Sequence, residues 1–111
     1  MKIPLAALFL ALATGFSANC GAVTVKGMKN CVAWLKSHSE HAPPSQNTFA
    51  DNAWLDGYLS GVAVARNIDF LKGVDEKVIH LWMNNYCSSH PSELIGYAAD
   101  ALSVELVKRM R

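Results

Sequence analysis

The sequence lacks the short motifs that mark the commonest catalytic and nucleotide-binding sites. It contains no glycine-rich phosphate loop, no serine nucleophile elbow and no zinc-finger spacing of cysteine and histidine. His38 and His41 form an H-x-x-H pair, but they lie in a proline-rich stretch without an obvious third ligand. We therefore predict that the protein is not an enzyme and that it holds neither a metal ion nor another cofactor.

An excess of charge of one sign is also missing. The 111 residues include ten Lys and Arg, nine Asp and Glu and four His, for a formal net charge of +1. If Lys2 is removed with a signal peptide, as argued next, nine basic residues face nine acidic ones and the net charge is zero. This balance gives no indication of binding to nucleic acid or to an anionic membrane surface.

A hydrophobic run long enough to span a membrane is lacking too. The apolar stretch from Ile3 to Phe16 covers about 14 residues, whereas a membrane-spanning helix needs roughly 20. Lys2 precedes this stretch, and the small and polar residues 17–22 follow it. Because that order is typical of a cleavable secretory signal, we predict export to the periplasm and no stable membrane span.

The end of this signal leaves two alternatives. Cys20 and Ala22 satisfy the preference for small residues at a cleavage site, so the mature chain would begin at Val23 and residues 23–111 would form a single helical domain. In the other interpretation the protein is a lipoprotein with lipid attached to Cys20. Asn19 stands just before that cysteine, where lipoprotein signals usually carry Gly or Ala.

Cysteine is scarce, and its three positions are informative. Loss of Cys20 with the signal leaves Cys31 and Cys87, an even pair in an oxidising compartment. We predict that they form a disulfide; the alternative is two buried free thiols. The chain-entropy estimate for a loop of about 57 residues is a stabilisation of roughly 4 kcal/mol.

No stretch of the chain has the pattern of a strand, whereas four have helical periodicity. These segments are 25–38, then 51 or 52 to about 67, 75–88, and 91 nearly to 111. Residues 38–52 lack periodicity and contain Pro43-Pro44, which predicts a loop. Length and pattern together predict an all-α fold, a small four-helix bundle closed by one disulfide.

Two glycines interrupt the second segment. Gly57 and Gly61 are four residues apart and so share one face of the helix. Each costs about 1 kcal/mol relative to alanine in a helix. We interpret the pair as a site of close packing, where a neighbouring helix approaches the backbone.

Aromatic residues are numerous for so short a chain. Trp54, Tyr58, Trp82 and Tyr86 are candidates for a partner-binding groove or patch, because aromatic side chains combine large contact area with a polar end. The alternative is that they fill the core of the bundle. Sequence periodicity does not separate the two, since helix faces in small bundles are only partly buried.

Three short stretches carry a family resemblance. They are Cys31-Val-Ala-Trp-Leu35, then Trp54-Leu-Asp-Gly-Tyr-Leu-Ser-Gly61, then Tyr86-Cys87-Ser-Ser-His-Pro91, followed by a terminal helix rich in Ala and Leu. With these features the chain resembles the HdeA-like proteins, small exported helical domains with one disulfide. The resemblance covers nearly all of the mature chain. A similar layout of Gly-Tyr, Gly, Cys and Pro occurs in immunity proteins that neutralise type VI secretion toxins.

The resemblance implies a non-catalytic protein that binds other proteins. The best-known HdeA-like members are acid-stress chaperones, which implies unfolded clients as partners; the immunity pattern implies a cognate toxin instead. In acid the mature charge would rise to about +13, from nine Lys and Arg plus four His. A structural subunit of the cell envelope is a third alternative, and self-association as a homodimer remains open.

Overall fold

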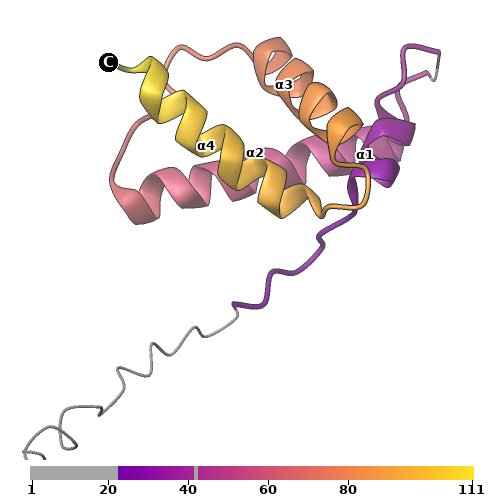
Figure 1. Ribbon diagram of the computed structural model, residues 1–111, viewed down its shortest axis with the longest axis horizontal. Helices are drawn as coiled ribbons and strands as arrows, with labels where there is room; N and C mark the ends of the chain where they lie inside the picture. Colours follow the sequence, from indigo (N-terminus) through magenta and orange to yellow (C-terminus); the bar gives the residue numbers. More distant parts are fainter. Residues whose placement is uncertain (1–22, 42) are drawn as a thin grey trace, which may run out of the picture.

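A computed structural model of the chain describes residues 23–41 and 43–111 (Figure 1). The predicted secretory signal, including Cys20, lies outside the described residues. Within those residues the fold is all-α: four helices, with no strand beyond a single bridge between Asn30 and Leu94. The helices are α1 (Cys31–Ser37), α2 (Gln46–Arg66), α3 (Glu76–Ser89) and α4 (Ile95–Arg109).

Side-chain caps fix where three of the helices begin. Asn30 accepts a hydrogen bond from the backbone N–H of Ala33 and so caps α1. Asp75 accepts a hydrogen bond from the backbone N–H of Lys77 and so caps α3. Ser45 and Thr48 form a reciprocal capping box at the start of α2. The prediction that the second helix begins at residue 51 or 52 is therefore wrong, and the predicted loop ends about one and a half turns earlier.

The first and last helices are also shorter at their N-terminal ends than predicted. The N–H of Cys31 donates to the carbonyl of Glu93 at 2.8 Å, and the N–H of Ile95 donates to the carbonyl of Lys29 at 2.8 Å. These two bonds engage the backbone just before α1 and α4. The sequence pattern had predicted that residues 25–30 and 91–94 belong to the helices. This prediction is wrong, because both segments lie outside them.

The predicted disulfide between Cys31 and Cys87 is present and fully buried. It joins the first residue of α1 to the last turn of α3. In Figure 1, α3 and α4 form a hairpin closed by the loop 90–94, and α2 crosses α4 and packs against it. The largest buried side chains of the core come from all four helices and the connector 67–75: Trp34, Leu55, Leu59, Phe70, Met83, Ile95 and Leu102.

The interpretation of Gly57 and Gly61 as close-packing positions is wrong. Both are exposed, and a Cβ atom added at either would meet no atom within 4 Å. The close approach occurs instead at buried Gly96 in α4, where an added Cβ would collide with the sulfur of Met28. Four-residue spacing indicates a shared face, but it does not say whether that face points toward a neighbour or toward solvent.

No helix among the described residues is long and apolar enough to cross a membrane.

Candidate functional site

A dense polar cluster, called here the closed junction, lies between α1 and α2 and reaches α3 through Asn84. At its centre is Asp51, only 2% exposed. Its carboxylate pairs with the ammonium group of Lys29 at 2.7 Å and accepts a hydrogen bond from the Ser37 hydroxyl at 2.7 Å. The members of the closed junction are Lys29, Trp34, Ser37, His38, Asp51, Asn52 and Asn84.

The closed junction contains a serine, a histidine and an aspartate, but not in the order of a nucleophilic triad. In a triad the imidazole lies between the hydroxyl and the carboxylate. Here the Ser37 hydroxyl lies between them, 2.7 Å from Asp51 Oδ2 and 2.9 Å from His38 Nδ1. Its single proton forms the stronger, charge-assisted bond to the carboxylate. The arrangement therefore anchors α1 to α2 and does not activate the hydroxyl.

Stacked rings complete the closed junction. The His38 imidazole stacks on the Trp34 indole with centroids 3.7 Å apart, and its Nε2 lies 2.7 Å from Asn52 Oδ1. The Trp34 indole N–H donates to Asn84 Oδ1 at 2.8 Å, which ties α1 to α3. The polar atoms of this cluster are engaged with one another, so it offers a ligand few free groups.

Of the four aromatic residues predicted to bind a partner, Trp54 and Tyr58 tie parts of the domain together. They stack on each other in α2, with ring centroids 5.0 Å apart. The Trp54 indole N–H donates to the carbonyl of Lys26, and the Tyr58 hydroxyl donates to Asp100. Burial and the bond to Asp100 raise the pKa of Tyr58 to about 12. Both rings are half-buried.

The other two, Trp82 and Tyr86, form a second stack on α3, with ring centroids 5.2 Å apart. His90 extends the row by stacking on Tyr86 at 4.1 Å. The Tyr86 hydroxyl donates to the carboxylate of Glu93 at 2.6 Å, a bond that raises the pKa of Tyr86. The structure thus places the four candidates in two separate pairs, one on α2 and one on α3.

A shallow hollow lies at each end of the hairpin formed by α3 and α4. The first, about 360 Å³, lies where α3 begins and α4 ends; Val78 and Met110 stand exposed at its walls, above buried Phe70. The second, about 560 Å³, lies near the 90–94 loop, between Tyr86, Leu94 and Tyr97. Exposed apolar side chains thus flank the hairpin at both ends.

Trp82 connects these two hollows along α3. Val78, Trp82 and Tyr86 follow one another at four-residue spacing, so they share one face of the helix. We call this surface the α3–α4 seam. Its members are Val78, Trp82, Tyr86, Leu94, Tyr97, Leu106 and Met110.

Sequence reasoning missed Tyr97 and Met110 as parts of this surface. Tyr97 is 61% exposed although it lies in a helix with a strongly apolar face. The available signal was its position opposite the face of Ile95, Ala98, Ala99 and Leu102 in the helical period. Met110 gave no such signal, because a residue at a helix end has too few neighbours along the chain to define a face.

The structure groups no metal-binding set among residues 23–41 and 43–111: no three His, Cys, Asp or Glu side chains lie close enough to hold a metal ion. His38 is committed to the closed junction, whereas His41 is exposed.

Comparison with known proteins gave no match: no family model, curated protein or solved structure is significantly similar to the chain. The resemblance to the HdeA-like proteins therefore stays a prediction from the residues that carry it.

Proposed function

We propose that this protein is an exported domain that binds other proteins through the α3–α4 seam and catalyses no reaction. The observation that supports this proposal most directly is the stacked pair Trp82–Tyr86, which lies between two hollows with exposed apolar walls. Tryptophan and tyrosine are the residues that most often dominate binding energy at protein interfaces. The fully buried disulfide supports export, since such bonds persist in oxidising compartments.

The seam suits a protein partner better than a small molecule. Its hollows are shallow and lie at opposite ends of a helical hairpin, so one compact ligand would not fill both. A helix or an extended segment could lie along the hairpin and place a side chain in each hollow. Tyr97 would provide a large aromatic contact at one end and Met110 an adaptable apolar contact at the other.

The leading form of this proposal is the acid-stress chaperone that the family resemblance implies. Protonation of nine carboxylates leaves the mature domain strongly cationic, and self-repulsion then favours opening of the helices. The disulfide would keep α1 joined to α3 in the opened state. The apolar side chains of the seam would then be available to unfolded clients together with core residues.

An aggregation assay tests this form. A purified periplasmic enzyme is brought to about pH 2.5, where carboxylates are protonated, and light scattering is followed with and without the protein. We expect the protein to suppress scattering, and the double variant Tyr97→Ser, Met110→Ser to suppress it less. The matched control is Phe49→Ser, Val64→Ser, two exposed apolar residues on α2 outside the seam. Equal scattering with and without the protein would exclude the chaperone.

The second candidate is an immunity protein, and the preformed seam favours it, because toxin recognition needs no opening in acid. Calorimetry at neutral pH with the product of the adjacent gene tests this candidate. We expect nanomolar binding, weakened about tenfold or more by the seam variant and unchanged by the α2 control. If neither clients nor that neighbouring product bind, both the chaperone and the immunity candidates are refuted.

A further inference from the structure

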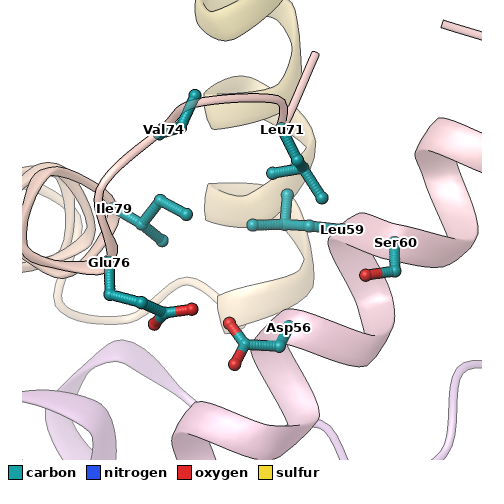
Figure 2. A pocket seen from close by; sticks show the side chains of 7 residues that line it. All are labelled: Asp56, Leu59, Ser60, Leu71, Val74, Glu76 and Ile79. Atoms are coloured by element: carbon teal, nitrogen blue, oxygen red, sulfur yellow. The ribbon is translucent and has the colours of Figure 1, made fainter. Parts of the chain in front are cut away.

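A third hollow lies on the other side of the connector that joins α2 to α3. Figure 2 shows this pocket, of about 200 Å³, between the middle of α2 and the first turns of α3. Four aliphatic side chains form its walls: Leu59, Leu71, Val74 and Ile79. Asp56 from α2 and Glu76 from α3 stand at one side, with their carboxylates directed toward each other. We call it the acidic pocket.

The two carboxylates of the acidic pocket have no basic partner within the part of the chain that the structure describes. Neither Asp56 nor Glu76 forms an ion pair there with a lysine or an arginine. Among the described residues, the ion pair of Glu76 is with His80, whose Nε2 lies 3.3 Å from Glu76 Oε2. Two like charges that face each other across a narrow opening repel, and a cation placed between them would relieve that repulsion.

The walls of the acidic pocket define which cation fits. A calcium ion takes six to eight oxygen ligands, whereas this pocket offers two carboxylates and the hydroxyl of Ser60 beside aliphatic carbon. An apolar wall with an acidic rim matches a ligand that has an aliphatic stem and a positive end. The lysine side chain has this character: its methylene stem packs on apolar surface while its ammonium group stays at the polar edge.

We propose that the acidic pocket receives a lysine side chain of the protein that docks on the α3–α4 seam. This inference rests on the proposed function. Val74 lines both the acidic pocket and the hollow beside Phe70, so the two sites are neighbours along one short connector. A partner that fills the hollow with an apolar side chain can reach over the connector and place a lysine between Asp56 and Glu76. The pocket is too small for the 300–1,000 Å³ typical of drug-sized ligands, which fits a single side chain.

The test uses a probe that does not require the partner. Nα-acetyl-lysine methylamide is titrated into the isotope-labelled protein, and backbone amide shifts are recorded by NMR. We expect saturable shifts confined to residues 56–60 and 71–79. The norleucine analogue, which has the aliphatic stem without the ammonium group, should bind at least about fivefold more weakly.

Two double variants test whether the carboxylates of Asp56 and Glu76 bind the ammonium group of the lysine probe. Asp56→Asn with Glu76→Gln should weaken binding of the lysine probe about tenfold. The control, Asp69→Asn with Glu40→Gln, removes the same two charges at exposed positions outside the pocket and should leave binding unchanged. Equal weakening by both double variants would show a non-specific charge effect and overturn the proposal. Absence of saturable shifts would overturn it as well.

A further titration distinguishes two ligands of the acidic pocket: a lysine side chain of a protein partner and a free small amine. If 1,5-diaminopentane binds more than about tenfold tighter than the capped lysine, the pocket serves a small amine and the docking proposal is wrong. Failure of the proposed function is seen separately, in the seam variants and their α2 control. Lysine binding without any protein partner would refute the proposed function and leave only an amine site.

Discussion

Helix α3 has two unlike neighbourhoods. On the side of α1, the closed junction and the Cys31–Cys87 disulfide together join three elements through a covalent bond, a buried ion pair and hydrogen bonds between side chains. Between α3 and α4, and where the start of α3 and the connector 67–75 meet α2, apolar and acidic side chains line three hollows. The polar groups of the closed junction are engaged with one another, whereas the hollows present apolar side chains and two carboxylates that pair with no lysine or arginine among the described residues.

The difference teaches where stability and recognition reside in this domain. A small helical domain has few buried apolar residues, so a cross-link and a buried polar network contribute a large share of its stability. Because α1 is anchored in this way, the fold does not require the hollows on the opposite side of α3 to be filled. Substitutions in the closed junction should therefore affect folding, whereas those in the seam and acidic pocket should affect binding. The four predictions below test this division, from the largest effect to the smallest.

Loss of the disulfide should have the largest effect. Cys31 and Cys87 are separated by 56 positions, and for a loop of this length the replacement Cys31→Ser, Cys87→Ser should lower the free energy of unfolding by about 4 kcal/mol. Urea unfolding followed by circular dichroism measures this loss, and the reduced wild-type protein should match the variant. A loss below about 1 kcal/mol would show that the disulfide does not dominate the stability of the closed junction.

Replacing either member of the buried ion pair should lower the free energy of unfolding, but by unequal amounts. Lys29→Met leaves the Asp51 carboxylate buried without its countercharge and should cost about 3 kcal/mol. Asp51→Asn leaves an ammonium group that is 41% exposed and can be hydrated by water, so it should cost only about 1–2 kcal/mol. Urea midpoints of the two variants give the comparison. The reverse order would mean that Asp51 is not the buried member on which the junction depends.

Outside the closed junction, Tyr58 links α2 to α4 and should give a pH-dependent effect of moderate size. Folding raises the pKa of Tyr58 from 10.0 to about 12, so the folded state holds the phenol proton more tightly than the unfolded state. This contribution is complete below pH 10 and is lost as the pH rises through about 12. Urea midpoints of wild type and Tyr58→Phe should therefore converge over this interval. A constant difference across it would contradict the assigned role of the Asp100 bond.

The smallest effect on stability is expected in the seam. Tyr97→Ser should change the free energy of unfolding by less than about 0.5 kcal/mol, because exposed positions without buried partners usually do. Phe49→Ser, which replaces a ring that is 72% exposed on α2, should behave in the same way. Thermal unfolding compares the two variants. A large loss for Tyr97→Ser alone would assign its ring to the core and remove it from the docking surface.

The sequence predicted the number of helices and the disulfide because both depend on local signals. Apolar periodicity identifies helices, and the two cysteines that lie after the predicted secretory signal suggest a single pairing. Helix starts were less predictable. Lys29 and Glu93 are far apart in sequence, and the bonds between their backbones and the starts of α4 and α1 exist only in the folded chain.

The sequence predicted which types of residue form the candidate site, but not which of them the fold brings together on one surface. Trp82 and Tyr86 were identified as aromatic candidates, and they do stack on one face of α3. Tyr97 was not selected, although its position opposite the apolar face of the last helix indicated exposure, and Met110 gave no signal because it stands at a helix end. Asp56 and Glu76 lie twenty positions apart, and their meeting at one pocket depends on the path of the connector between α2 and α3.

The sequence by itself determined an all-α domain with four helices and one cross-link, since helical period and cysteine number are properties of the chain. Tertiary structure decided which surfaces are closed and which are open. Packing of α1 against α2 and α3 buried Asp51, Trp34 and the disulfide. The paths of the connector and of α4 left the seam and the acidic pocket accessible, because helices of fixed length and direction cannot cover every side of a neighbour at once.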